Sequence, residues 1–204
     1  MLTFILVVLM LFLIPGPAVF LTISQTIKGG TKNGIVTGLG IALGDLGHTF
    51  AAVLGLSAIL MTSALAFEII KYLGAAYLVY LGICALIEKS KTTKKPVIKE
   101  GKTTASFRQA LFIELLNPKT SLFFLAFLPQ FVQTNGIPVT TQLLVLGLTF
   151  VFMSISYTTL LVFLTSTVGN RFFSKTNRCS HWIGKVVGIV YIGLGLKLAL
   201  QTQE

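Results

Sequence analysis

Long apolar runs separated by short polar connections dominate the sequence, and they predict six membrane-spanning helices. The runs cover residues 2–27, 35–60, 64 or 67 to 87, 107–131, 139–168 and 183–200. Each is close to or above the roughly 20 residues that a helix needs to cross the hydrocarbon core of a bilayer. Only 11% of the 204 residues are charged and the mean hydropathy is +0.87, which excludes a soluble domain.

Two of these runs are interrupted by proline near their middle, at Pro15-Gly16-Pro17 in the first and at Asn117-Pro118 in the fourth. Proline has no amide proton and its ring clashes with the preceding turn, so a helix stops there. In hydrocarbon a broken backbone is stable only where protein or a water-filled cavity covers it. The breaks therefore predict a solute site, in which the new helix N-termini offer unpaired N–H groups to an anion such as a carboxylate. The alternative for the first break is a packing kink.

Two charged residues in the middle of apolar runs are the next candidates for this site. Asp45 lies about ten residues into the second run, which places it near the bilayer midplane. An intramembrane carboxylate is a functional hypothesis by default, and proton coupling is the role we expect. Lys119 follows the second break directly and is a candidate to bind a substrate carboxylate. The alternatives are an Asp45–Lys119 structural ion pair and a lysine that extends to the interface.

Four further polar residues have weaker claims. Glu114 lies one turn before the second break, where it faces either the lysine after that break or the cytoplasmic mouth. His48 is one turn from Asp45 on the same helix face, and is either a proton relay or a neutral, hydrogen-bonded histidine. Ser154 and Thr158 of the fifth run either line the pathway or bond back to their own helix.

The second run carries small residues at steps of three and four, which predicts that another helix approaches it closely. These residues are Gly40, Gly44, Gly47, Ala51 and Gly55.

The positive charges fall on alternate connections. They lie at residues 28–32, in the lysine-rich segment 89–106 and at residues 171–178. By the positive-inside rule these connections are cytoplasmic and both termini are outside. Because the net charge of +10 is explained in this way, we expect no nucleic-acid partner. The two cysteines, Cys84 and Cys179, have no metal-binding or redox spacing, so neither a metal site nor a cofactor is predicted.

An internal repeat relates the two halves of the chain. Lys71-x-x-Gly74-x-x-Tyr77 opens the third run and Lys185-x-x-Gly188-x-x-Tyr191 opens the sixth. Three spans separate equivalent points, and an odd number inverts orientation, so the halves are predicted to be inverted repeats. We therefore expect one all-α transmembrane domain over residues 1–204, with repeats at 1–88 and 107–204 joined by the cytoplasmic linker 89–106.

Taken together, these motifs resemble the LysE/RhtB family of amino-acid exporters. The motifs are Pro15-Gly16-Pro17, Gly34, Gly40, Gly44-Asp45, Lys71-x-x-Gly74-Ala75-x-Tyr77, Leu116-Asn117-Pro118-Lys119 and Phe127-x-Pro129-Gln130-Phe131. The resemblance implies efflux of amino acids or related small metabolites by proton exchange across a bacterial cytoplasmic membrane. Two positions depart from the family pattern: Ala18 stands where the family often has asparagine, and Glu114 is atypical.

Two other classes of function are weighed against this one. A channel or a regulatory membrane subunit would share the composition, and saturable counterflow would separate a carrier from it. A membrane-embedded enzyme needs a nucleophile–base set, a metal cluster or paired cysteines, and the sequence favours none of these. The expected partners are the solute, protons and the lipid bilayer, with a homodimer as the candidate assembly; the solute itself, the coupling ion and its stoichiometry are left open.

Overall fold

A computed structural model describes residues 1–56, 64–87, 103–133 and 136–173, together with single residues between 185 and 200. More than half of the sixth predicted run lies outside the described residues. Most of the lysine-rich linker lies outside them too, so the inverted repeat and the positions of the termini stay predictions.

Every regular element within these residues is helical, as the sequence predicts. The elements are α1 (Leu2–Leu13), α2 (Pro17–Ala51), the π-helical turn η1 (Ala52–Leu56), α4 (Ala64–Ile87), α5 (Thr103–Leu115), α6 (Pro118–Ala126), the 3₁₀ turn η2 (Leu128–Phe131) and α7 (Val139–Phe173). By length and composition, two of these stretches can cross a membrane, Pro17–Leu56 and Val139–Thr167. A third candidate is α5 with α6 and η2, which are bent by 45° where they meet.

Both predicted breaks are present. Helix α1 ends at Leu13, and the backbone of Ile14 and Gly16 is extended. Helix α2 then starts with Pro17 in its first turn, where the missing N–H costs nothing. Residues 14–16 are called the first break below, and residues 116–117, between α5 and α6, the second break.

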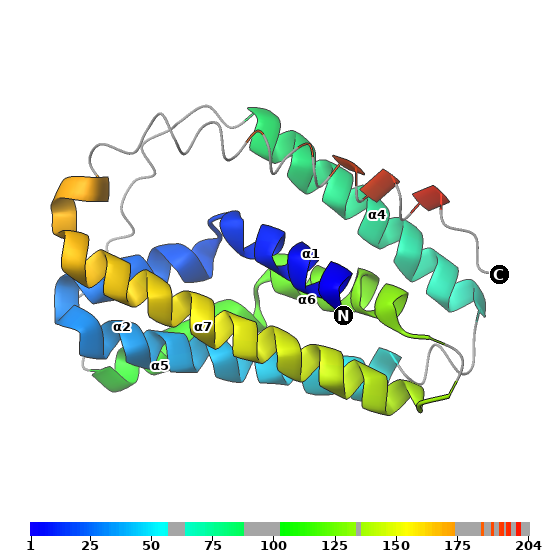
Figure 1. Ribbon diagram of the computed structural model, residues 1–204, viewed down its shortest axis with the longest axis horizontal. Helices are drawn as coiled ribbons and strands as arrows, with labels where there is room; N and C mark the ends of the chain where they lie inside the picture. Colours follow the sequence, from blue (N-terminus) through cyan, green and yellow to red (C-terminus); the bar gives the residue numbers. More distant parts are fainter. Residues whose placement is uncertain are drawn as a thin grey trace.

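Helix α2 is two helical segments joined at Gly30. Gly30 has a φ of 70°, in the left-handed region that glycine adopts without steric cost. The chain reverses there, so that the segments 17–29 and 31–51 run back along each other (Figure 1). The backbone of Gly34 packs directly against Thr26 across this reversal. The connection between the first two predicted runs, residues 28–34, is thus helical except at the single residue Gly30.

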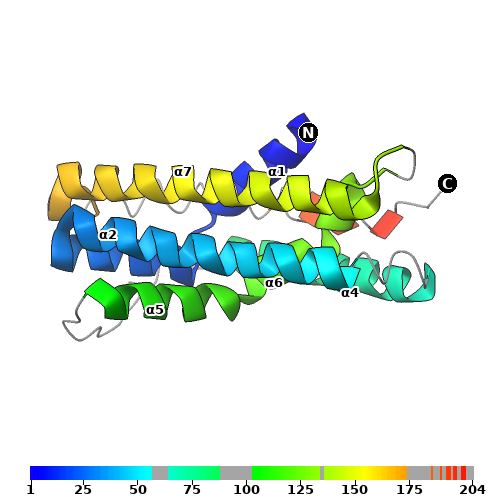
Figure 2. The same cartoon turned by 90° about the horizontal axis from the view of Figure 1, so that it is seen from below.

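Helix α2 lies between α5 and α7, with α7 on one side and α5 with α6 on the other (Figure 2). The glycines of its second segment make this packing close, as predicted. Gly40, Gly44 and Gly47 lie against α5, and Gly34 and Gly38 lie against α7. Gly55 does not share this packing, since none of the described residues lies within 4 Å of where its Cβ would be.

Substitution of Gly40 by alanine is expected to destabilise the fold. The added Cβ would lie 2.5 Å from the backbone oxygen of Phe107 and 2.9 Å from Ala110 Cβ, so α5 must move away. Overpacking of this kind costs about 1–3 kcal/mol, which a lower thermal unfolding midpoint in detergent would report. Gly55→Ala is the matched control, because its Cβ meets no atom within 4 Å in the described part of the chain. Equal midpoints for the two variants would contradict the close approach.

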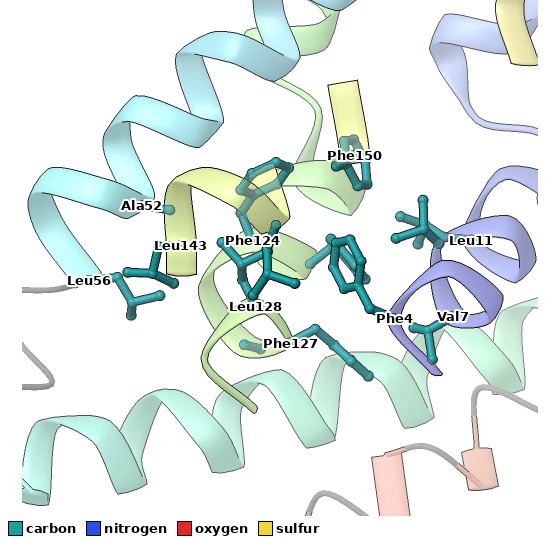
Figure 3. Close-up of a cluster of buried hydrophobic side chains, with 14 of the residues drawn as sticks. Phe4, Val7, Leu11, Ala52, Leu56, Phe124, Phe127, Leu128, Leu143 and Phe150 are labelled. Carbon is teal, nitrogen blue, oxygen red and sulfur yellow. The ribbon is translucent and has the colours of Figure 1, made fainter. Parts of the chain in front are cut away.

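A buried apolar cluster fills the region where α1, α6, η2 and α7 meet the end of α2 (Figure 3). Its centre is aromatic: Phe150 lies with its ring centroid 4.9 Å from that of Phe124 and 5.3 Å from that of Phe123. Phe4 of α1 packs against Phe123 and Phe131. This cluster fixes α1 and α6, the two helices that flank the breaks, relative to each other.

Candidate functional site

The two breaks meet. The Lys119 ammonium, in the first turn of α6, donates a hydrogen bond of 2.8 Å to the carbonyl oxygen of Ile14 in the first break. Gly16 lies against the same side chain, since a Cβ there would be 3.7 Å from Lys119 Cδ. A lysine near the middle of a predicted span therefore holds the end of α1 and does not extend to the interface.

The second break is organised by Asn117. Its side-chain oxygen accepts a 3.1 Å hydrogen bond from the Lys119 amide and so caps α6, as the Asn-Pro pair predicts. Its side-chain amide donates to both carboxylate oxygens of Glu114, at 3.1 and 3.2 Å. The Thr120 hydroxyl also donates to Glu114. Glu114 is therefore held inside the protein by hydrogen bonds from Asn117 in the second break and from Thr120 in the first turn of α6.

Asp45 is the second buried carboxylate and is only 1% exposed. It interacts with the side chains of Glu114 and Ser154, and with the more distant charge of Lys119. Its Oδ2 atom has no hydrogen-bond partner among the described residues. The Lys119 ammonium donates to Ile14 instead, so the direct Asp45–Lys119 ion pair that we considered is not formed in the part of the chain described here.

His48 of α2 contacts the end of α5, just before the second break. Its Nε2 lies 2.9 Å from the backbone oxygen of Glu114, and because a carbonyl only accepts, this nitrogen carries the proton. The ring packs against Phe124 with centroids 5.8 Å apart. The side chain thus makes a hydrogen bond that supports the fold, and a proton relay through it stays a prediction.

A small cavity of about 40 Å³ lies between the breaks. A water molecule needs roughly 10–15 Å³ of such space, so there is room for a few waters. The cavity is lined by residues from five helices: Leu11, Phe12, Gly16, Ala18, Val19, Ile41, Asp45, Glu114, Asn117, Lys119, Thr120, Phe150, Ser154, Tyr157 and Thr158.

Most of the predicted site residues line this cavity, and a few do not. Gly16, Ala18, Asp45, Glu114, Asn117 and Lys119 line it, as do the weaker candidates Ser154 and Thr158. Pro15, Pro17, Pro118 and His48 are absent from the lining; the prolines shape the breaks instead.

Sequence reasoning missed seven lining residues: Leu11, Phe12, Val19, Ile41, Thr120, Phe150 and Tyr157. Two carried a signal, since Thr120 follows directly on the charged residue after the second break and Tyr157 lies one helical turn after Ser154. Phe12 is one of many aromatics in an apolar run, and its ring stacks on Tyr157 with centroids 5.3 Å apart. Nothing in the sequence distinguishes it.

The N-terminus of α2 presents backbone donors to the cavity. No side chain caps this helix, and its first i to i+4 hydrogen bond runs from the Phe20 amide to the Gly16 carbonyl. The amides of Ala18 and Val19 therefore lack partners within the helix, and both residues line the cavity. Unpaired amides at a helix N-terminus bind anions.

The lining separates into chemically different parts. The α2 N-terminus and Lys119 suit an anion, whereas Asp45 and Glu114 suit a cation. Leu11, Phe12, Val19, Ile41 and Phe150 provide apolar surface. Such an arrangement matches a small molecule that carries both charges and an apolar group.

Interrupted helices that meet around a small polar cavity are typical of membrane transport proteins. The chain belongs to the family described as LysE type translocator, whose model matches residues 9–202. This confirms the resemblance drawn from the sequence motifs and, with the apolar helices, makes the chain a multi-pass membrane protein.

Several curated proteins are similar over nearly their whole length. A membrane protein of Bacillus subtilis, named YrhP and described as uncharacterized, is 32% identical and covers 98% of both chains. Leucine efflux proteins of Salmonella choleraesuis and Klebsiella pneumoniae are 26% and 27% identical, over 97% of this chain and 93% of theirs. No solved structure matches the chain.

Proposed function

We propose that the protein exports amino acids or closely related metabolites across the cytoplasmic membrane in exchange for protons. The observation that carries this proposal is the meeting of two interrupted helices at one cavity that holds Asp45 and Lys119. Membership of the LysE type translocators and similarity to proteins named leucine efflux protein support it.

The lining suggests how an amino acid is held. Its carboxylate binds the free amides at the start of α2 and the Lys119 ammonium, and its ammonium group binds Asp45. An aliphatic side chain packs against Phe12, Ile41 and Phe150. The 40 Å³ cavity is too small for this ligand, so the described conformation is a closed one and binding requires the helices to separate.

The two ends of the cavity differ, which suggests a direction of opening. Phe150 and Leu11 belong both to the cavity lining and to the buried apolar cluster (Figure 3), which we infer closes this end of the cavity. Toward Gly30, the buried residues include Thr22, Thr26 and Gln25, whose side-chain amide donates to Gln109 Oε1 at 3.4 Å. Polar groups stabilise a water-filled path, so we place the cytoplasmic entrance at the Gly30 end and the outer gate at the aromatic cluster.

The topology proposed with this function has six spans in two inverted three-helix repeats and both termini outside. The positive charges near Gly30 then face the cytoplasm, in agreement with the entrance proposed above. A homodimer is the candidate assembly.

Counterflow in proteoliposomes tests the function. Vesicles loaded with unlabelled leucine should take up external radiolabelled leucine transiently and saturably, and a proton gradient should drive net leucine movement against the proton flow. Leucine is the first probe because relatives are named for its efflux; a panel of neutral and charged amino acids follows. Leak that does not saturate would indicate a channel, and the absence of any flux across the panel would refute the proposal.

A further inference from the structure

Two buried carboxylates lie together in the cavity, and both belong to the described site. Asp45 is 1% exposed and Glu114 is 3% exposed, and the two side chains interact directly. The helices that carry them are pressed together at this level, since a Cβ on Gly44 would lie only 2.7 Å from Glu114 Cβ. Two carboxylates in contact in an apolar interior do not both stay ionised unless a cation lies between them.

The available cation is not placed to neutralise this pair by contact. The Lys119 ammonium donates to the Ile14 carbonyl and acts on the two carboxylates only through its charge at longer range. Glu114 accepts from Asn117 and Thr120, which donate hydrogen bonds but carry no charge. On the other carboxylate, Asp45 Oδ2 is buried without any partner among the described residues, and Asp45 lines the cavity.

We propose that Asp45 and Glu114 form one proton-holding pair, and that the ammonium group of the substrate displaces this proton. This inference rests on the proposed function and assigns the coupling to both residues. The other groups that interact with Asp45 are Lys119 from α6 and Ser154 from α7, and Tyr157 of α7 lines the same cavity. None of these replaces Glu114 as the second carboxylate.

The exchange step balances without any further reactant. In the empty carrier the pair shares one proton. When an amino acid enters from the cytoplasm, its ammonium group contacts both carboxylates and the proton leaves to the cytoplasm. When the carrier opens outward, an external proton returns to the pair and the amino acid departs. One proton thus moves inward for each amino acid that moves outward.

Glu114→Gln tests the pair with little change in structure. Both Asn117 and Thr120 donate to the same oxygen of Glu114, Oε1, and a glutamine oxygen at that position accepts both hydrogen bonds. The glutamine nitrogen then takes the place of Oε2 and cannot accept the 3.1 Å hydrogen bond from the Asn117 amide, so that bond is lost. The variant carries no charge and in this respect resembles a permanently protonated Glu114. Glu68→Gln makes the same change on an exposed side chain of α4 and is the matched control.

The readout is proton release on substrate binding, measured with a pH indicator in weakly buffered detergent solution, together with flux in proteoliposomes. Wild type and Glu68→Gln should release about one proton per leucine bound. Glu114→Gln should bind leucine more weakly, because one of the two carboxylates that contact the ammonium group is gone, and it should release no proton per leucine bound. Its flux driven by a proton gradient should fall at least about tenfold further than its leucine counterflow, the effect of about one pKa unit of free energy. Unchanged proton release and unchanged gradient-driven flux in Glu114→Gln would overturn the pair, even with the exporter function intact. Absence of any flux in wild type would instead refute the proposed function.

Discussion

Asp45→Asn is expected to abolish proton-driven export and to reduce leucine counterflow by about 30-fold or more. The ammonium group of the substrate would lose the carboxylate that faces it, and breaking a buried charge pair costs about 2 kcal/mol or more, which corresponds to that factor. This variant should lose more exchange than Glu114→Gln, because Asp45 has an oxygen with no partner among the described residues, and this oxygen is free to accept from the ammonium group.

The thermal unfolding midpoint of Asp45→Asn shows whether its loss of transport results from misfolding. Asparagine has nearly the same shape as aspartate, and the substitution removes a buried charge without an ion-pair partner in contact. The thermal unfolding midpoint of Asp45→Asn should therefore equal or exceed that of wild type. Full counterflow in a stable Asp45→Asn protein would remove Asp45 from the mechanism.

Lys119→Met should weaken both the fold and the recognition of the substrate carboxylate. The Ile14 carbonyl would lose its buried donor, and the two carboxylates would lose their nearest positive charge. Removing one partner from a buried charge network costs about 3–5 kcal/mol, so the unfolding midpoint should fall clearly. Lys185→Met, at an exposed lysine, is the control and should leave the midpoint unchanged.

Substrate analogues distinguish the binding role of Lys119 from its structural role. Leucinamide keeps the ammonium group and the side chain of leucine but lacks the carboxylate. In wild type, leucine should bind at least about tenfold more tightly than leucinamide, because hydrogen bonds to charged groups contribute about 1.5–3 kcal/mol. This preference should disappear in Lys119→Met, measured at a temperature below its unfolding transition. A preserved preference would assign the carboxylate to the α2 N-terminus alone.

The breaks could be predicted from the sequence because proline acts locally. Pro17 and Pro118 end one helix and begin the next whatever surrounds them, and the structure has both new helices starting at these residues. The close packing at Gly40 and Gly44 could also be predicted locally, because small residues that recur on one face of a membrane helix let a neighbouring helix approach closely.

The partners of the charged residues could not be predicted, because they depend on how distant segments pack. Ile14 and Lys119 are 105 positions apart, and no sequence pattern indicates that the lysine donates a hydrogen bond to a backbone carbonyl. Glu114 had two alternatives of equal weight, and the contacts with Asn117 and Asp45 follow only from the bend between α5 and α6. A turn between the first two runs could be predicted, but its confinement to the single residue Gly30 could not, because a run of lysines and glycines is equally compatible with a longer turn.

Protection of engineered cysteines by substrate tests most directly whether the two breaks enclose one solute site. Cys84 and Cys179 are first replaced by serine, and single cysteines are placed at Ala18 of α2, at Thr120 of α6 and, as the control, at the exposed Leu39. A small membrane-permeant thiol reagent is then applied with and without leucine. The account predicts that leucine slows labelling at Ala18→Cys and Thr120→Cys alike and leaves Leu39→Cys unaffected. In a protein shown to transport leucine, labelling at both break positions that is indifferent to leucine would contradict it.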